Sequence, residues 1–260
     1  MLSLSKHDSS TSVSDTSKFR GIVEAALVDP QAWRFFRSHP YFTEILEHVS
    51  KSQGWDYLRI LESQSFKVRE ALSALGGFNK IGGPALHRFG QYGRTSPTML
   101  RYLKVGMDLS HLFGDLQSMT VSEIGVGYGG QATVLAKRFG VRSFQFFDLP
   151  PVLKLAEKFL GEFVPDVSVT SFDGSGVIPM TKSDLVVSNY AFSELRRDVQ
   201  EAYLNKVLSG APRGYVTWNP LSPDGFSPEE LLQLIPNSRL FPEEPLSFPG
   251  NVIVVWGVSH

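Results

Sequence analysis

Four glycines fall within six residues in the stretch VSEIGVGYGGQATVL, which covers residues 121–135. The stretch opens as a short apolar run and continues as a helical pattern, so the glycines stand where a strand is followed by a helix. Glycine loses more conformational freedom than any other residue when its backbone is fixed. A cluster of this kind therefore indicates a backbone that turns sharply or that comes close to a ligand.

After residue 119, apolar runs of strand length alternate with helical patterns. The strand-like runs are residues 120–126, 141–148, 166–172, 183–191 and 214–219, and the helical segments are residues 131–140, 150–163, 193–210 and 227–235. Such alternation predicts an α/β fold with a parallel sheet covered on both faces. Two further strand-like runs, residues 238–243 and 251–258, have no helix between them. We therefore expect a seven-stranded sheet whose last hairpin inserts one antiparallel strand.

The first part of the chain has a different pattern. Up to about residue 75 it is helical and rich in aromatic residues, and Pro30 and Pro40 break it into short helices. A glycine-rich connector over residues 76–94 predicts loop, and residues 96–113 predict a further helix that Ser96 caps. We interpret residues 18–118 as an N-terminal helical cap and lid segment, and residues 119–260 as the ligand-binding domain. Residues 1–17 contain nine Ser or Thr and predict a disordered tail.

Charge and composition exclude several partners and chemistries. The 25 Lys and Arg nearly balance the 26 Asp and Glu, so the net charge of −1 gives no electrostatic basis for nucleic acid or a membrane surface as the main partner. The absence of cysteine excludes disulfides, thiolate nucleophiles and Cys-based zinc sites. No apolar run approaches the ~20 residues of a membrane-spanning helix, and no secretory signal is recognisable. We therefore expect a cytoplasmic protein, and a homo-oligomer is left open.

Two ligand classes place a glycine-rich turn after the first strand of such a sheet. Gly125, Gly127 and Gly130 satisfy G-x-G-x-x-G, in which a helix N-terminus holds the pyrophosphate of a dinucleotide. Gly125, Gly127 and Gly129 equally satisfy the E-x-G-x-G-x-G pattern of S-adenosylmethionine (SAM) methyltransferases, with Glu123 as its acidic opening. The glycines alone leave both classes open.

Acidic residues at the next two strand ends favour SAM. Asp148 ends the second strand, beside Leu149, where its carboxylate could accept hydrogen bonds from two ribose hydroxyls or could merely cap the next helix. Both ligands contain ribose, so Asp148 alone does not discriminate between them. Asp173 ends the third strand, where methyltransferases usually contact the exocyclic amine of adenine, although an ordinary Asp-Gly turn would explain the same residue. The final hairpin also suits a methyltransferase sheet better than a dinucleotide fold.

Residues 88–220 resemble bacterial sugar O-methyltransferases. The resemblance rests on YGRTSPTMLRYLKVGMDL, EIGVGYGGQATVL, FFDLPPVLKLAEKFL, SNYAFSEL and YVTWN, and it covers about half of the chain. It implies a Rossmann-like class I methyltransferase fold, SAM as the methyl donor, and an acceptor hydroxyl on a sugar or glycosylated small molecule. Ser96 and Arg101 lie in the resembling segment, and an arginine there could pair with the carboxylate of the methionine moiety of SAM. An arginine on a solvated helix face is the alternative.

The fourth strand ends in NYAFSEL, at the sheet edge where the methyl group would be presented. Asn189 and Tyr190 are therefore candidate cofactor contacts. Tyr128, inside the glycine turn, would either stack near the cofactor or simply cover the turn.

Transfer to a sugar hydroxyl calls for a general base or for a metal that lowers the pKa of the hydroxyl. Glu194 is one candidate base, although Ser193 as an N-cap followed by Glu194 at the first helical position explains the pattern equally well. His87, in PALHRFGQYGR, is the other candidate, with a surface histidine as its alternative. The six histidines show no metal-ligand spacing, so no metal ligand is assigned and the need for a divalent metal stays open.

The sequence thus predicts a SAM-dependent O-methyltransferase that acts on a hydroxyl of a sugar or sugar-containing small molecule. Two alternatives remain. An NAD(P)-dependent oxidoreductase on a dinucleotide-binding fold would bind NAD(H) in place of SAM. A non-catalytic protein would keep the fold as a binding module without transferring a methyl group.

Overall fold

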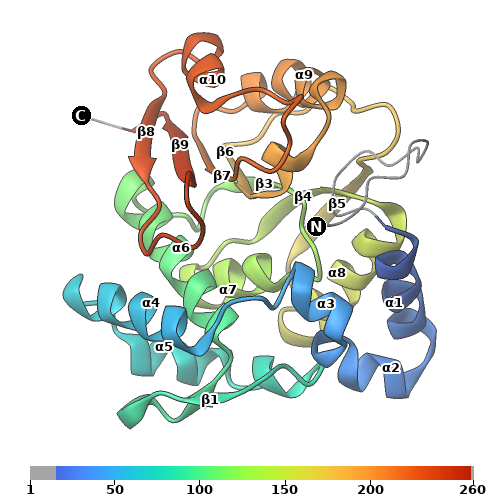
Figure 1. Ribbon diagram of the computed structural model, residues 1–260, viewed down its shortest axis with the longest axis vertical. Helices are drawn as coiled ribbons and strands as arrows, with labels where there is room; N and C mark the ends of the chain where they lie inside the picture. Colours follow the sequence, from blue (N-terminus) through green and yellow to red (C-terminus); the bar gives the residue numbers. More distant parts are fainter. Residues whose placement is uncertain (1–15, 259–260) are drawn as a thin grey trace.

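A seven-stranded sheet dominates the computed structural model, which describes residues 16–258 (Figure 1). Its strand order is β5-β4-β3-β6-β7-β9-β8, and β9 runs antiparallel between β7 and β8 whereas the strands from β5 to β7 are parallel. The predicted α/β fold class, with a seven-stranded sheet whose last hairpin inserts one antiparallel strand, is confirmed. The strands are β3 (Thr120–Ile124), β4 (Ser143–Asp148), β5 (Ser168–Asp173), β6 (Leu185–Asn189), β7 (Gly214–Trp218), β8 (Arg239–Pro242) and β9 (Val252–Trp256).

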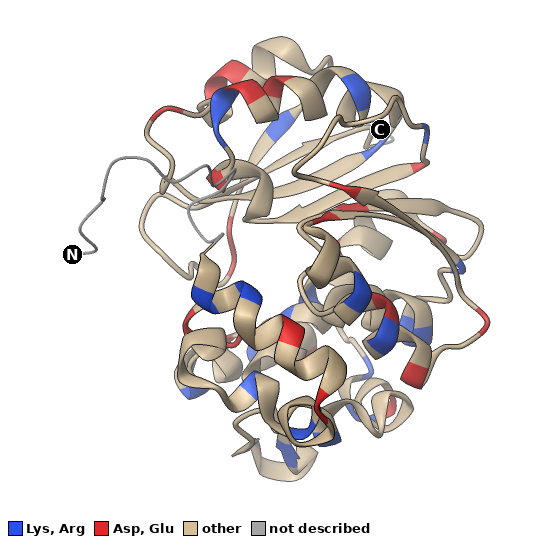
Figure 2. Cartoon of the chain, turned by 90° about the vertical axis from the view of Figure 1, so that its right-hand side faces the viewer, with Lys and Arg blue, Asp and Glu red and all other residues tan. Residues whose placement is uncertain are grey.

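Helices cover both faces of this sheet, and Figure 2 shows the layers from a second side. One face carries α6 (Pro97–Phe113), α7 (Gly130–Phe139) and α8 (Pro150–Phe163), whose apolar side chains share a buried cluster with those of β3 and β4. The other face carries α9 (Arg197–Lys206) and α10 (Pro228–Leu234), packed around Trp218 and Trp256. Burial on both faces explains why the central strand β6 reads as an apolar run.

Residues 18–118, predicted as a helical cap and lid segment, contain five α-helices before α6, and the name cap is used below for these five helices and the loops that join them. Pro30 and Pro40 begin two of them, as expected for a residue whose fixed φ suits the first helical turn. The helix α1 packs on α8, and α4 packs on α6. The five helices are α1 (Ser17–Val28), α2 (Pro30–Phe35), α3 (Pro40–Ile45), α4 (Lys51–Ser63) and α5 (Val68–Leu75).

Two segments differ from the sequence prediction. The connector over residues 76–94 is not all loop, because it contains the two-stranded hairpin β1 (His87–Arg88) and β2 (Arg94–Thr95). Ser17 is helical, since the Thr16 hydroxyl accepts a hydrogen bond from the Phe19 backbone N–H and caps α1. The remainder of the expected tail, residues 1–15, lies outside the described residues.

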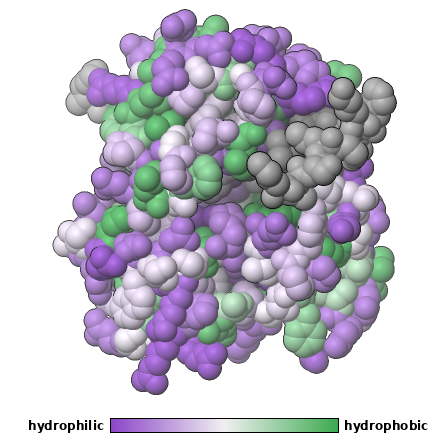
Figure 3. Space-filling view, viewed as in Figure 1, coloured by the Kyte–Doolittle hydropathy of each residue, from purple (hydrophilic) through white to green (hydrophobic). Residues whose placement is uncertain are grey.

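Within residues 16–258, no helix is both long and apolar enough to cross a membrane. Basic and acidic residues are interspersed along the helices in Figure 2. Polar and apolar residues are likewise mixed on the face of the molecule shown in Figure 3.

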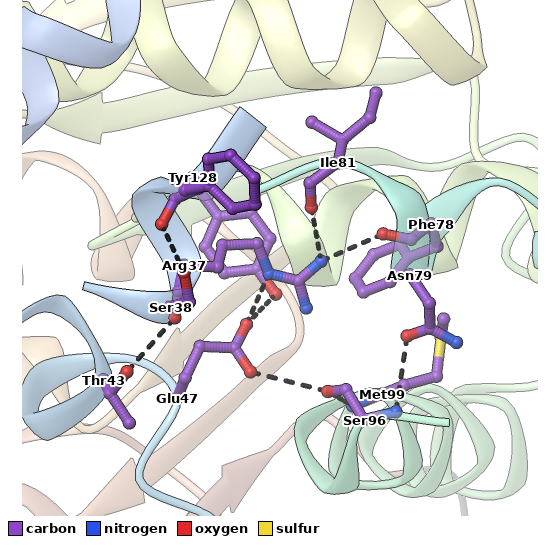
Figure 4. A network of polar contacts seen from close by, with 11 residues as sticks. Arg37, Ser38, Thr43, Glu47, Phe78, Asn79, Ile81, Ser96, Met99 and Tyr128 are labelled. Carbon is purple, nitrogen blue, oxygen red and sulfur yellow. Dashed lines mark hydrogen bonds and ion pairs between the residues drawn. The ribbon is translucent and has the colours of Figure 1, made fainter. Parts of the chain in front are cut away.

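A buried ion pair joins the cap to the glycine turn (Figure 4). The Arg37 side chain is 0% exposed, and its Nε donates to Glu47 Oε1 at 2.6 Å. Its Nη1 donates to the backbone oxygens of Phe78 at 2.9 Å and Ile81 at 3.3 Å. The Tyr128 hydroxyl donates to the same Glu47 oxygen at 3.0 Å, so the pair reaches the turn itself.

Aromatic rings surround the rest of the guanidinium. Its carbon lies 4.7 Å from the ring centroid of Tyr128 and 4.8 Å from that of Phe78, where the ring faces attract a cation. The Nη2 atom has no hydrogen-bond partner among the described residues. Desolvation of two charges offsets much of their attraction, so we expect this pair to define the position of the cap more than to add net stability.

Replacing Arg37 by Met keeps much of the side-chain volume and leaves the Glu47 carboxylate buried without its cation. We expect Arg37→Met to lower the free energy of unfolding by about 3–5 kcal/mol, measured by urea unfolding. The exposed pair Arg196–Asp198 provides the control, and Arg196→Met should cost less than ~1 kcal/mol because that arginine is 56% exposed. Equal losses in the two variants would contradict a special role for the buried pair.

Candidate functional site

A cavity of about 460 Å³ lies at the carboxyl ends of β3, β4 and β6. This volume falls in the range of about 300–1,000 Å³ that is typical of small-molecule and cofactor sites. The cap, the sheet edge and the loop between β8 and β9 all contribute to its wall. The cavity brings together eight of the residues expected from the sequence, namely Arg101, Gly125, Gly127, Asp148, Leu149, Asn189, Tyr190 and Glu194.

Gly125 and Gly127 line the cavity at places where a larger residue does not fit. Their φ angles are 75° and 55°, in the left-handed region that favours glycine. A Cβ on Gly125 would lie 2.0 Å from the Cβ of Ala191, which follows β6. A Cβ on Gly127 would lie 3.3 Å from the Leu46 side chain of the cap. The two glycines therefore let the turn approach β6 and the cap closely.

Gly129, Gly130 and Tyr128 serve packing and do not line the cavity. A Cβ on Gly129 would lie 2.9 Å from the Ala156 backbone oxygen of α8, and Gly130 faces the rings of Tyr128 and Tyr102. Tyr128 is 1% exposed and belongs to the aromatic cluster between the cap and the sheet. Of the two roles expected for Tyr128, the structure therefore shows that it covers the turn. The N-terminus of α7 is likewise packed against protein.

Asp148 connects the end of β4 to the glycine turn. Its Oδ2 accepts from the Gly127 backbone N–H at 3.1 Å, and its Oδ1 accepts from the Leu149 backbone N–H at 2.8 Å. The N-cap position of α8 is occupied by Leu149, so Asp148 is not the N-cap residue of that helix. A carboxylate oxygen can accept more than one hydrogen bond, so Asp148 can also accept from ligand hydroxyls in the cavity.

Asp173 and Glu123 lie near this edge but outside the cavity lining. Asp173 pairs in register with Asp148, yet its Oδ1 accepts from the Ser175 backbone N–H at 2.9 Å and from its hydroxyl at 2.6 Å. These contacts are those of an Asp-Gly turn, the alternative to an adenine contact. Glu123 is 2% exposed within β3, and its Oε2 has no hydrogen-bond partner among the described residues.

Tyr190, directly after β6, has an unusual backbone conformation. Its φ is 68°, which is uncommon for a residue other than glycine and carries a steric cost. Its hydroxyl donates to Glu243 and lies 3.3 Å from Ser247 Oγ, so the ring is held by the loop between β8 and β9. Burial raises the pKa of the Tyr190 phenol well above its ordinary value, so the group stays protonated near neutral pH.

Glu194 reaches the cavity from a short 3₁₀ helix, η4 (Ala191–Glu194). The predicted start of the next helix at Ser193 is wrong, because α9 begins at Arg197. The Ser193 hydroxyl instead donates to the Tyr190 backbone oxygen at 2.6 Å and accepts from the Asn219 backbone N–H at 3.1 Å. Glu194 Oε1 accepts from the Asn219 side-chain amide at 2.8 Å, which orients the carboxylate.

Arg101 extends from α6 to the cavity and is 6% exposed. Its Nη1 lies 3.3 Å from His48 Nε2, and its guanidinium carbon lies 5.7 Å from the ring centroid of Tyr190. No ion pair joins Arg101 to a carboxylate of the described residues. A buried guanidinium of this kind is suited to an anionic group on a ligand. The surrounding protein and the charge of Arg101 lower the pKa of His48 to about 4, so its ring is neutral at pH 7.

Two expected site residues lie elsewhere. Ser96 caps α6 as predicted, with its hydroxyl accepting from the Met99 backbone N–H at 3.3 Å, and it also donates to Glu47 Oε2 at 3.4 Å. It is 0% exposed and contributes no atom to the cavity. His87 lies in the β1–β2 hairpin, which Figure 1 places on the cap side of the molecule away from α9 and α10, and it is absent from the cavity lining.

Several lining residues were not identified from the sequence. His48 and Glu44 come from the cap, Asn219 follows β7, and Asn251 precedes β9. They stand in loops or at element ends, where no periodic pattern marks a functional position. Among the described residues, no group of three or more His, Asp or Glu side chains is placed to hold a metal ion.

Comparisons with known proteins give a distant structural likeness. No protein-family model matches the sequence, and no curated protein matches it. One similar solved structure is human N-acetylserotonin methyltransferase in complex with SAM, with 12% identity over 84% of this chain and 69% of that chain and a TM-score of 0.45. TehB from Haemophilus influenzae is 12% identical over 58% of this chain and 61% of that chain, with a TM-score of 0.46. The methyltransferase domain of a bacterial Hen1 is 13% identical over 60% of this chain and 96% of that chain, also with a TM-score of 0.46. Likeness at this level carries no activity or ligand over to this chain, so its function is argued from its own site.

Glu123 makes stability depend on pH. Burial, reinforced by the negative charge of Asp148, raises the pKa of its carboxyl well above 4.5. In the unfolded chain the Glu123 carboxyl keeps its ordinary pKa of 4.5. The stability that the neutral carboxyl gives the folded protein is therefore fully present below pH 4.5, and it is lost as the pH rises toward the pKa of the folded state. We expect Glu123→Gln to raise the free energy of unfolding at pH 8 by on the order of 1 kcal/mol or more, and to have little effect near pH 4.

Urea unfolding at the two pH values checks this expectation. Glu162→Gln, on the exposed side of α8, is the matched control and should behave like the parent protein at both. A Glu123→Gln effect of the same size at pH 4 and pH 8 would contradict a buried carboxyl with a raised pKa.

Proposed function

We propose that this protein is a SAM-dependent O-methyltransferase that acts on a hydroxyl of a sugar or sugar-containing small molecule. The observation that carries the proposal is the position of Asp148. Its carboxylate stands at the end of β4, is bonded to the Gly127 N–H, and lines the same cavity as Gly125 and Tyr190. A ribose hydroxyl pair, an amino-acid carboxylate and an acceptor would each meet a suitable group in this one cavity.

Each part of SAM has a candidate partner. Asp148 would accept hydrogen bonds from the ribose hydroxyls, with Leu149 offering an apolar contact to adenine. Arg101 would pair with the carboxylate of the methionine moiety. Asn189 and Tyr190, at the end of β6, would lie beside the reacting methyl group. Bound SAM would supply that methyl group, its carbon–sulfur bond breaking as the bond to the acceptor oxygen forms.

The surroundings of the glycine turn favour SAM over a dinucleotide. A pyrophosphate needs the N–H groups at a helix N-terminus to face the ligand. Gly129 is the N-cap of α7 and Gly130 its first residue, but both pack against protein and neither lines the cavity. The Gly127 N–H is already bonded to a carboxylate, which would repel a phosphate.

Glu194 is our candidate for the general base. It lines the cavity close to the end of β6, and Asn219 fixes its orientation. As a carboxylate it could take the proton from the acceptor hydroxyl as the oxygen attacks. His87 does not line the cavity, which leaves it without access to an acceptor there.

Removal of the Asp148 carboxylate tests the cofactor assignment. We expect Asp148→Ala to weaken SAM binding by at least about tenfold in titration calorimetry, because two charge-assisted hydrogen bonds are lost. Asp166→Ala, an exposed residue beyond α8, should leave the affinity unchanged. NAD(H) binding in place of SAM would favour the oxidoreductase alternative.

The variant Glu194→Gln tests catalysis separately from SAM binding. With methyl-labelled SAM and a panel of nucleotide sugars, free sugars and phenols, we expect label on a sugar hydroxyl and a kcat for Glu194→Gln that is about 10²–10⁴-fold lower. The affinity for SAM should stay the same, and His87→Ala should keep the parent kcat. A kcat that falls with His87→Ala but not with Glu194→Gln would reverse the assignment, and binding without transfer to any acceptor would favour the non-catalytic alternative.

A further inference from the structure

The charged residues in the cavity wall are mostly acidic. Among the described residues, three carboxylates line it, those of Glu44, Asp148 and Glu194, against the one guanidinium of Arg101. No lysine is among the described residues that line it. His48 adds no charge at pH 7 because its pKa is about 4. With Asp148 on ribose and Arg101 on the amino-acid carboxylate, Glu44 and Glu194 are the charged groups that the described part of the wall leaves for the acceptor.

Apolar side chains also stand exposed at the cavity wall. Leu221, which follows β7, is 48% exposed, and Phe248, in the loop between β8 and β9, is 51% exposed. Both line the cavity. Ile45 and Leu46 line it from the cap. An exposed apolar surface that is continuous with a ligand cavity is typical of a binding surface.

The loop that carries Phe248 is held in place by a buried carboxylate. Glu243 is 6% exposed and accepts from the Ser247 backbone N–H at 2.8 Å and from the Asn251 side-chain amide at 3.0 Å. It also accepts from the Tyr190 hydroxyl, which ties the loop to the end of β6. These bonds fix the loop on both sides of Phe248, so the exposure of that ring is a feature of an ordered loop.

We propose that the acceptor is an uncharged sugar joined to an apolar group, with the apolar group lying on Leu221 and Phe248. This rests on the proposed methyltransferase function and narrows its substrate class. A nucleotide sugar would bring a diphosphate to Glu44 and Glu194, where like charges repel. A nucleic acid strand would meet the same acidic wall. An alkyl or aryl glycoside would bury its apolar part and keep its hydroxyls near Glu194.

The test uses methyl-labelled SAM with three acceptors, which are octyl glucoside below its micelle concentration, glucose and UDP-glucose. We expect kcat/KM to be highest for octyl glucoside and lowest for UDP-glucose. Phe248→Ser and Leu221→Ser should each lower kcat/KM for octyl glucoside by about tenfold, because each removes part of an apolar contact. The same variants should leave kcat/KM for glucose and the affinity for SAM unchanged.

A matched control is Leu234→Ser, since Leu234 is 50% exposed on α10 but does not line the cavity. It should change none of these values. A preference for UDP-glucose, transfer to none of the three acceptors, or equal losses with Leu234→Ser would overturn the proposal on the acceptor. So would preferred methyl transfer to an RNA oligonucleotide assayed beside the three acceptors. Loss of SAM binding in the parent protein would be a separate result, because it would overturn the methyltransferase function itself.

Discussion

The hydrogen bond from the Gly127 N–H to Asp148 is the contact on which the site depends. It holds the turn after β3 against the end of β4 at an N···O distance of 3.1 Å. On the other side of the turn, Tyr128 donates to Glu47 of the cap at 3.0 Å. The turn is therefore fixed by the sheet and by the cap at once. A shift of either would move the backbone that lines the cavity.

This double attachment gives the cap a function beyond covering apolar surface. The Arg37–Glu47 pair is buried against the same tyrosine ring that packs on Gly130. Buried ion pairs contribute little net stability but tolerate few alternative geometries. Leu46 directly precedes Glu47 in the chain, and its side chain would lie 3.3 Å from a Cβ added at Gly127. The pair thus couples the placement of the cap to the shape of the cavity.

Periodic features of the fold could be predicted from the sequence, and isolated side chains could not. The strands β3, β6, β7 and β9 follow from apolar runs, because a strand buried on both faces needs them, whereas the edge strands β5 and β8 are much more exposed. The cavity position of Asp148 follows from its place at a strand end, since parallel strands end at one edge of the sheet. The cavity position of His48 and the place of His87 outside the lining could not be predicted, because His48 lies in an irregular segment and His87 in a two-residue strand, and the course of both depends on tertiary contacts. The start of α9 was misplaced because Ser193, a good capping residue, bonds Asn219 across the sheet edge instead.

Tyr128 and Asp173, each with two possible roles, show a further limit of prediction from the sequence. A tyrosine in a glycine turn can face a ligand or the core, and only the position of the cap decides between them. A carboxylate before Gly174 can face adenine or its own backbone, and Ser175 satisfies it locally. Such choices depend on a neighbour a few ångströms away that the sequence pattern does not identify.

The most direct test of the account is a crystal structure of the protein with S-adenosylhomocysteine, the demethylated product of SAM. We expect both ribose hydroxyls within hydrogen-bond distance of the Asp148 carboxylate, and the amino-acid carboxylate at Arg101. A ligand bound with its ribose away from Asp148, or no ligand in this cavity at saturating concentration, would contradict the account.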